Sequence, residues 1–333
     1  MIQVALLGAG YIAKNHAAAY DRLPNTRLVA VLGKGKGHAE ELALKYGARA
    51  YTDANAMFNN ERIDMVDVCV PTYLHEQYVV MAAEYGADIL CEKPFALTRE
   101  AADHMIQAAK EAKKKLMVAQ VLRFWPEYVE IKKHIDNDDL GDIQMVYANR
   151  LAQHPDWSDW FKDPNKSGGG LFDLHSHDID ILHYYFGPEK TVYSLAYRNN
   201  AGCFNHVSSS LVFQNGVKAL AEGGFQMTEG YPFTMTMRVV GTKGTLEFLL
   251  SAGFNLENLG AASSRLVYFR NGHSPELLKV EQSDPYLNEI RYFTECVNER
   301  RDPDVVPPAD SRKVLDVMLS IRDSIETGEV QHL

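Results

Sequence analysis

The sequence feature that most constrains the fold is a glycine-rich turn directly after the first apolar segment. Residues 2–7 have the pattern of a short strand, and residues 8–13 follow with the spacing G-x-G-x-x-A at the start of a predicted helix. Gly8 permits a tight strand-to-helix turn, and Gly10 lets a pyrophosphate approach the backbone at the helix N-terminus. This pattern predicts a dinucleotide site. The expected contact residues are Gly8, Gly10, Tyr11 and Ile12.

The rest of the first third favours this interpretation over an ordinary glycine turn, because strand and helix patterns alternate along it. A nearly continuous apolar run at 63–70 has the composition of a strand buried on both faces. Repeated units of this kind predict an α/β fold with a doubly wound parallel sheet. Further strands are expected at 27–32, 88–91 and 116–121, and helices at 38–46, 73–85 and 98–115.

Beyond residue 122 the pattern changes to strand-like runs separated by turn signals such as Asn215-Gly216 and Asn271-Gly272. We therefore predict a second α/β domain with a large, mostly antiparallel sheet that is open on one face. Such a face favours a homodimer or homotetramer. The expected divisions are 1–122 for the nucleotide domain, 123–303 for the substrate and oligomerisation domain, and 304–333 for a helix that returns to the first domain.

Composition excludes several other classes of protein. The net charge of −10 argues against binding to nucleic acid or to an anionic membrane surface. No apolar run approaches the ~20 residues of a membrane helix. The four cysteines are scattered, and the chain begins directly with a strand rather than a signal peptide. These observations predict a cytoplasmic protein whose partner is a small molecule.

The end of the second strand bears on the choice of cofactor. Folds specific for NAD usually carry an acidic residue there, whereas this chain has Gly33 followed by Lys34 and Lys36. The two lysines would suit a 2′-phosphate, so the sequence favours NADP(H). NAD(H) or dual use stays open, because surface lysines are also common in solvated loops.

Two further segments follow the carboxyl ends of predicted strands, where ligands bind in open α/β sheets. In the first, Pro71 fixes the chain direction, Thr72 is expected to cap the next helix, and His75 lies one turn into it. Contact with the cofactor and a buried structural role are equally supported for His75.

The second segment is Glu92-Lys93-Pro94. Pro94 holds Lys93 extended, and we predict that Glu92 orients Lys93 beside the cofactor. As a cation Lys93 would polarise a hydroxyl or carbonyl oxygen.

The other concentration of polar residues follows the glycines at 168–170. On a helix, Asp173, His177 and Asp180 have the spacing i, i+4, i+7 and share one face. His177 is suited to proton transfer, and Asp173 to binding a substrate hydroxyl. Secondary substrate candidates are the aromatic residues Trp157, Trp160 and Phe161 of the preceding loop, and Arg123, Trp125 and Tyr128 after the strand expected at 116–121.

Taken together, these motifs resemble the family of glucose–fructose oxidoreductase and inositol dehydrogenase (Gfo/Idh/MocA) over nearly the whole chain. The resemblance implies a Rossmann domain, an open-sheet domain that commonly forms dimers or tetramers, and an NAD(P)-dependent oxidoreductase acting on a sugar, cyclitol or related polyhydroxy compound. It also implies that Lys93 is the catalytic lysine, Asp173 the substrate-positioning aspartate and His177 the proton-transferring histidine. The chain departs from the family pattern at His175, where glycine is usual, and at Gly33.

Two alternatives remain open from the sequence. The run from His175 to Asp180 is rich in metal-binding residue types, which would suit a metallohydrolase. On a regular helix, however, His175 and His177 lie about 200° apart and cannot face one ion. A non-catalytic nucleotide sensor on the same fold is the second alternative, and it would not need Lys93, Asp173 and His177.

Overall fold

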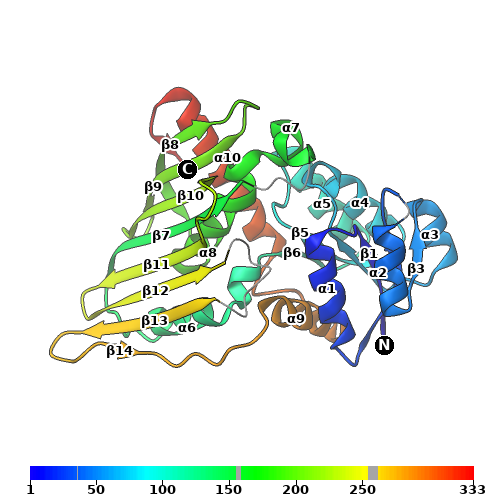
Figure 1. Ribbon diagram of the computed structural model, residues 1–333, viewed down its shortest axis with the longest axis horizontal. Helices are drawn as coiled ribbons and strands as arrows, with labels where there is room; N and C mark the ends of the chain where they lie inside the picture. The colour runs from blue at the N-terminus through cyan, green and yellow to red at the C-terminus, as the bar shows by residue number, and fades with distance from the viewer. Residues whose placement is uncertain (36, 155–158, 254–261) are drawn as a thin grey trace. The chain divides into compact units, whose positions relative to one another are not determined.

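The computed structural model describes residues 1–35, 37–154, 159–253 and 262–333. These residues form two compact units, each built around one sheet (Figure 1). Unit 1 comprises Met1–Trp125 and Ser283–Lys313, and unit 2 comprises Pro126–Gln282 and Val314–Leu333.

These divisions differ from the boundaries expected at 122 and 303. Helix α9 (Pro285–Glu299) belongs to unit 1, because Leu287, Ile290 and Phe293 join the apolar core around the first strand. The last helix, α10 (Pro308–Thr327), starts in unit 1 and ends in unit 2.

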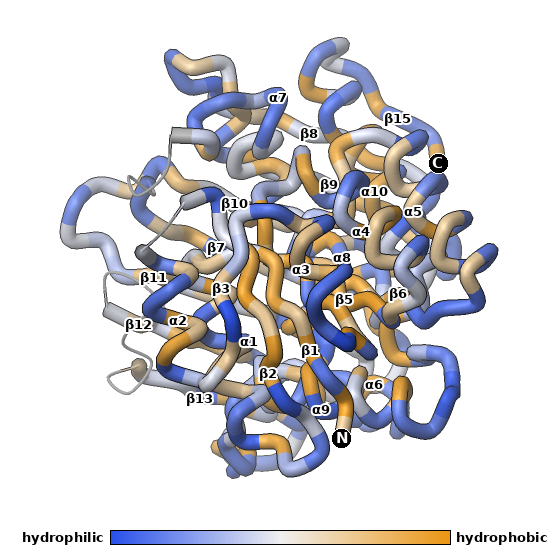
Figure 2. The backbone as a smooth tube through the Cα atoms, turned by 90° about the vertical axis from the view of Figure 1, so that its right-hand side faces the viewer, coloured by the Kyte–Doolittle hydropathy of each residue, from blue (hydrophilic) through white to orange (hydrophobic). Residues whose placement is uncertain are grey.

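The sheet of unit 1 has six parallel strands in the order β3-β2-β1-β4-β5-β6, which confirms the predicted doubly wound sheet. Apolar residues dominate β1 and β2 in Figure 2, as burial on both faces requires. The strands are β1 (Ile2–Leu7), β2 (Thr26–Leu32), β3 (Arg49–Tyr51), β4 (Met65–Val68), β5 (Asp88–Glu92) and β6 (Leu116–Ala119).

The helices of unit 1 end where the sequence supplies the appropriate residues. Gly47 and Gly86 adopt positive φ values of 67° and 77° after α2 and α4, and the Thr98 hydroxyl accepts the Ala101 amide at the start of α5. The helices are α1 (Tyr11–Asp21), α2 (His38–Tyr46), α3 (Ala54–Asn60), α4 (His75–Glu84) and α5 (Arg99–Glu111). The short elements β3 and α3 were not expected from the sequence.

Unit 2 contains a nine-stranded sheet in which only the central pair, β7 and β10, is parallel. This confirms the expected, mostly antiparallel sheet. The order is β14-β13-β12-β11-β7-β10-β9-β8-β15. The strands are β7 (Ile143–Gln153), β8 (Glu189–Arg198), β9 (Phe204–Phe213), β10 (Lys218–Met227), β11 (Phe233–Gly241), β12 (Gly244–Ala252), β13 (Ser263–Arg270), β14 (Glu276–Leu277) and β15 (Gln331–His332).

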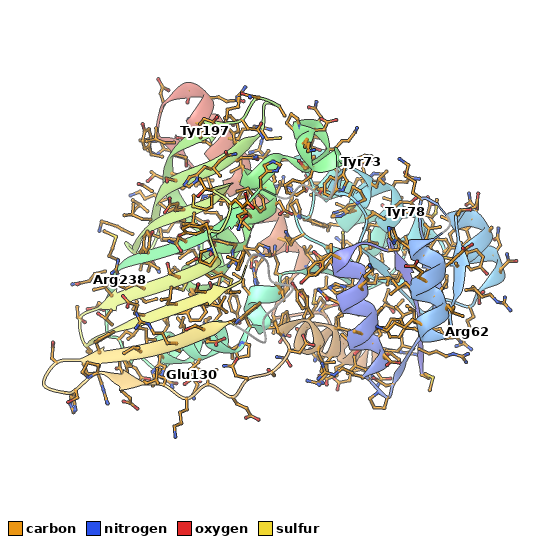
Figure 3. All side chains as sticks on the ribbon, in the orientation of Figure 1. Arg62, Tyr73, Tyr78, Glu130, Tyr197 and Arg238 are labelled. Carbon is orange, nitrogen blue, oxygen red and sulfur yellow. The ribbon has the colours of Figure 1, made fainter. Side chains whose placement is uncertain are left out.

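Alternation of side chains gives this sheet a buried face and an exposed face. The buried face includes Val146 and Ala148 and packs against helices of unit 2, among them α6 (Pro126–Asp136) and α8 (Ser176–Phe186). Tyr197 of β8 and Arg238 of β11, labelled in Figure 3, are exposed. Because strand order depends on pairing between distant segments, the sequence did not specify it.

Two general expectations can be compared with the structure. All four cysteines are free thiols and buried. Among the helices described, none combines the length and the apolar character that crossing a bilayer requires.

Candidate functional site

The glycine turn lies at the point of unit 1 where the strand order reverses, between β1 and β4. Gly8 has φ of 113°, and a Cβ added there would lie 2.2 Å from the Cys69 carbonyl oxygen, so only glycine fits. A Cβ on Gly10 would meet no described atom within 4 Å, and the N-terminus of α1 has no side-chain cap. An open backbone at an uncapped helix N-terminus fits the pyrophosphate of a dinucleotide.

The end of β2 explains why the acidic residue of NAD-specific folds is missing. A Cβ on Gly33 would lie 2.7 Å from the Cβ of Ala39 at the start of α2, so the close packing of this loop favours glycine. Lys34 is exposed, while Lys36 lies outside the described residues. At the turn itself, Tyr11 is 39% exposed and Ile12 is partly buried.

The segment after β4 differs from the prediction in one respect. Thr72 does not cap α4: it begins a 3₁₀ turn (Thr72–Leu74), and no side chain caps either element. The ring of His75 is buried between two backbone carbonyls, with Nε2 3.0 Å from Val70 O and Nδ1 3.3 Å from Phe95 O. Burial lowers the pKa of His75. These contacts give His75 a structural role, and its contact with a cofactor stays a prediction.

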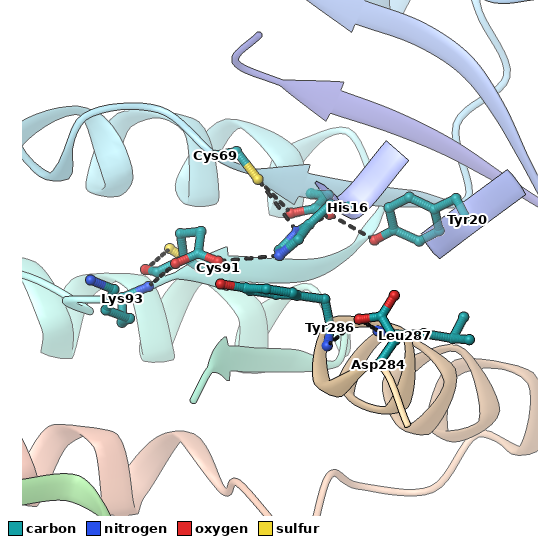
Figure 4. Close-up of polar contacts among 10 residues, drawn as sticks. His16, Tyr20, Cys69, Cys91, Lys93, Asp284, Tyr286 and Leu287 are labelled. Carbon is teal, nitrogen blue, oxygen red and sulfur yellow. Dashed lines mark hydrogen bonds and ion pairs between the residues drawn. The ribbon is translucent and has the colours of Figure 1, made fainter. Parts of the chain in front are cut away.

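Lys93 follows β5 and is partly buried, and its peptide bond to Pro94 is cis. Its backbone N–H donates to Glu92 Oε2 at 3.0 Å, so Glu92 fixes the main chain at Lys93. The other carboxylate oxygen, Glu92 Oε1, lies 3.3 Å from His16 Nε2 (Figure 4). Sequence reasoning expected Glu92 to orient Lys93, and the observed contact does this through the backbone.

Behind Glu92 lies a buried polar cluster that the sequence analysis missed. The Asp67 carboxylate accepts from His16 Nδ1 at 2.9 Å, Tyr20 Oη at 2.8 Å and Cys69 Sγ at 3.2 Å. In the sequence, Asp67 lies within the apolar run at 63–70. A charged residue on a strand buried on both faces is the signal that could have revealed the cluster. A carboxylate there requires buried partners.

In unit 2, Asp173 and His177 are both partly buried, whereas most residues around them are fully buried. Residues Leu171–His175 form a π-helical turn that continues into α8, so the helix is not regular as predicted. Such turns are frequent at functional sites. Asp180 is only 1% exposed and does not share the environment of Asp173 and His177.

Two of the residues considered as metal ligands, His175 and Asp178, contact separate protein partners, and so does His183 further along α8. His175 Nε2 lies 2.9 Å from Ser209 Oγ, and Asp178 forms a buried ion pair with Arg150 at 3.2 Å. His183 Nδ1 lies 2.9 Å from a Glu189 carboxylate oxygen. Space for His175 comes from β10, because a Cβ on Gly223 would lie 2.9 Å from His175 Nδ1. This divergence weakens the metallohydrolase alternative.

Most of the remaining substrate candidates are buried and contact other residues of the protein. Arg123 is 3% exposed, and its Nη1 donates to the Val305 carbonyl at 2.8 Å. Trp125 is 6% exposed and buried in unit 1. Trp160 is partly buried with its ring 5.4 Å from Phe161, which packs in turn on Phe225.

Two of the aromatic candidates are buried, and one is not described. Tyr128 and Phe161 are core residues, with 1% and 5% of their surface exposed. Trp157 lies outside the described residues.

Of the three residues expected to act in catalysis, Lys93 belongs to unit 1, and Asp173 and His177 belong to unit 2.

Comparison with known proteins supports the reading of both units. Residues 2–120 match the family described as "Oxidoreductase family, NAD-binding Rossmann fold", and residues 128–247 match "GFO/IDH/MocA C-terminal domain". The chain is 31% identical to inositol 2-dehydrogenase of Rhizobium meliloti (strain 1021), covering 90% of this chain and 89% of that protein.

Two other relatives differ in the cofactor that their names carry. D-xylose 1-dehydrogenase (NADP(+)) 2 of Haloferax volcanii is 27% identical, covering 91% of each chain. A levoglucosan dehydrogenase solved with NADH and levoglucosan has a TM-score of 0.84 at 23% identity, with 99% of each chain covered. With both of its units matched, the chain belongs to the Gfo/Idh/MocA family of NAD(P)-dependent oxidoreductases.

Proposed function

We propose that this protein interconverts a secondary alcohol and a ketone on a sugar, a cyclitol or a related polyhydroxy compound. The observation that carries the proposal is the β1–α1 turn. There Gly8 is sterically required, and the backbone at Gly10 is open beside an uncapped helix N-terminus. When bound, the nicotinamide supplies or accepts the hydride.

Three side chains are proposed to act on the same substrate. Lys93, with its backbone fixed by Glu92, polarises the reacting oxygen as a cation. His177 takes the hydroxyl proton during oxidation and returns it during reduction. Asp173 binds a neighbouring hydroxyl and so selects polyhydroxy compounds. The last two roles are supported by the partial exposure of Asp173 and His177 beside the π-helical turn.

The test combines binding with turnover. Purified protein in chelator-treated buffer is titrated with NADH and with NADPH by fluorescence, and then screened with cyclitols, aldoses and keto sugars by absorbance of the reduced nicotinamide. Binding of a reduced nucleotide and turnover of at least one polyhydroxy compound are expected. Binding without turnover across the panel would favour the nucleotide sensor, and binding of neither nucleotide would remove the oxidoreductase proposal.

The preference for NADP(H) is a separate proposal and rests on Lys34, which is exposed at the end of β2. We expect wild-type protein to bind NADPH more tightly than NADH, and Lys34→Glu to reverse or abolish that difference. A matched control is Lys45→Glu, which changes an exposed lysine of α2 in the same unit. An NADPH affinity that is unchanged in Lys34→Glu would make Lys34 a bystander.

We also propose that the exposed face of the unit 2 sheet forms a homodimer or homotetramer. Leu195 and Tyr197 of β8 are 61% and 57% exposed, and Leu220 of β10 is 46% exposed. Sedimentation of wild-type protein should give a dimer or larger, and Leu195→Lys should shift it towards monomer. Leu44→Lys, on an exposed residue of unit 1, is the control and should leave the mass unchanged.

The proposed compartment is the cytoplasm. Its support is the set of four buried free thiols, since structural disulfides belong to oxidising compartments.

A further inference from the structure

The buried polar cluster next to Glu92, formed by His16, Tyr20, Asp67 and Cys69, places ionisable side chains inside an apolar core. Asp67 and His16 have no exposed surface, although Asp67 lies on β4 between Met65 and Cys69, which both belong to the apolar core facing α1. A charge in such a place is costly unless it is fully paired.

The hydrogen bonds show how the buried carboxylate of Asp67 is paired. Asp67 accepts from three donors, those of His16, Tyr20 and Cys69. Burial of the His16 ring lowers its pKa, but the Asp67 carboxylate and its hydrogen bond outweigh burial and hold the pKa of His16 well above 6.5. The raised pKa favours the protonated, cationic ring of His16.

The two ring nitrogens of His16 have different neighbours. Nδ1 contacts Asp67, whereas Nε2 faces Glu92. His16 Nε2 lies 3.3 Å from Glu92 Oε1, an ion-pair distance without hydrogen-bond geometry. Glu92 Oε2 accepts the Lys93 backbone N–H at 3.0 Å. Figure 4 shows this series of contacts, with Tyr286 beside it. The ring centres of Tyr286 and His16 are 6.0 Å apart.

The same atoms also offer a metal ion a set of ligands. His16 Nδ1, a carboxylate oxygen of Asp67 and Cys69 Sγ all lie within 4.8 Å of one another. Their separations of 2.9 Å and 3.2 Å from Asp67 are, however, hydrogen-bond lengths, and three donors already bond to the carboxylate. The contacts favour a self-sufficient hydrogen-bond network.

We propose that His16, anchored by Asp67, is a positioning residue: it fixes the Glu92 carboxylate and, through Glu92, the backbone of Lys93. The proposal rests on the function proposed above for Lys93. It assigns a role to α1 beyond the glycine turn, because the helix that begins at the cofactor turn also holds the segment that carries Lys93. A purely structural pair would stabilise unit 1 without affecting Glu92 and Lys93.

Two substitutions of His16 separate these roles. The amide of Asn reaches the position of His Nδ1, whereas the amide of Gln reaches that of His Nε2. His16→Asn therefore keeps a partner for Asp67 and loses the one for Glu92, and His16→Gln does the reverse. His104→Gln, at an exposed histidine paired with Glu76 in the same unit, is the control.

The first readout needs no substrate. In protein labelled with ¹⁵N-lysine, the Lys93 amide is assigned with Lys93→Arg, and its hydrogen exchange is measured. We expect exchange at Lys93 to rise about tenfold more in His16→Asn than in His16→Gln, because only the former loses the group that restrains Glu92. Equal exchange in both variants would overturn the proposal, whatever the enzyme's activity.

The second readout is turnover. With a substrate from the screen above, we expect kcat to fall about tenfold to a hundredfold in His16→Asn and much less in His16→Gln, with KM and the nucleotide Kd changing little in either. Unchanged kcat in His16→Asn would mean that the contacts joining Asp67, His16 and Glu92 have only a structural role. Absence of turnover in wild-type protein would instead contradict the proposed function and leave the exchange result to decide on positioning.

A third readout addresses the charge and the metal. In ¹⁵N-histidine spectra the His16 signal should show both ring nitrogens protonated above pH 7, and the same spectrum should persist after chelator treatment. A neutral ring, or a signal that changes when metal is removed, would overturn the assignment of His16 as the cation between two carboxylates.

Discussion

His16 Nδ1 lies 2.9 Å from Asp67 Oδ2, with neither side chain exposed, although the two residues are 51 positions apart in the chain. Asp67→Asn should destabilise unit 1 by about 3–5 kcal/mol, because it removes the closer of the two carboxylates that face the buried His16 ring. Urea unfolding followed by circular dichroism measures this. A double variant with apolar residues, His16→Leu with Asp67→Val, should recover part of the loss, and failure to recover any would indicate that packing rather than charge dominates.

The same pair gives a pH dependence of known sign. Since the folded pKa of His16 is raised above its ordinary value, the contribution of the pair is complete below about pH 6.5 and is lost as pH rises through the folded pKa. The stability difference between wild-type protein and Asp67→Asn should therefore narrow towards alkaline pH. A difference that stays constant from pH 6 to pH 10 would contradict this prediction.

His175 should make unit 2 sensitive to acid. Burial, followed by the nearby His206, lowers the pKa of His175 to about 3. As the pH falls below about 6.5, this histidine is therefore protonated in the unfolded chain but stays neutral in the folded protein. Stability should fall by up to about 1.4 kcal/mol per pH unit from this group as pH drops below 6.5. His175→Gln should flatten that slope in urea titrations at several pH values. His38→Gln, at an exposed histidine, should keep the wild-type slope.

Two glycines of the cofactor turn should respond differently to alanine. Gly8→Ala should prevent unit 1 from folding normally, because its Cβ meets the Cys69 carbonyl at 2.2 Å and φ is 113°. Gly10→Ala meets no described atom within 4 Å, so unfolding should change by less than about 0.5 kcal/mol. Its methyl group should nevertheless weaken nucleotide binding at least about tenfold by blocking the pyrophosphate. Normal binding by Gly10→Ala would place the pyrophosphate elsewhere.

Lys93→Met should lower kcat by about 10²–10⁴-fold while leaving NADH and NADPH affinities nearly intact, because the methionine keeps the length of the side chain but removes the cation. Steady-state kinetics and fluorescence titration of the same preparation measure both effects. Lys110→Met, at an exposed lysine of α5, should behave as wild type. Normal turnover by Lys93→Met would remove Lys93 from the mechanism.

Local signals predicted much of the fold. The apolar strand ahead of Gly8, the capping by Thr98 and the glycines at 47 and 86 depend on neighbours in sequence, and the structure has the corresponding elements. The family resemblance and the two-sheet architecture were also confirmed. The assignments of Lys93, Asp173 and His177 to catalysis stay predictions.

What the sequence by itself determined is the set of elements whose hydrogen bonds and caps are local, together with the motifs at their ends. Tertiary structure decided the rest: the π-helical turn before α8, the transfer of α9 to unit 1, and the 3₁₀ turn at Thr72 that replaced a helix cap. It also decided that Asp67 and His16 meet. Periodicity shows that a strand is buried, but which side chain from another element completes a buried charge depends on contacts between distant segments, and these exist only in the folded chain.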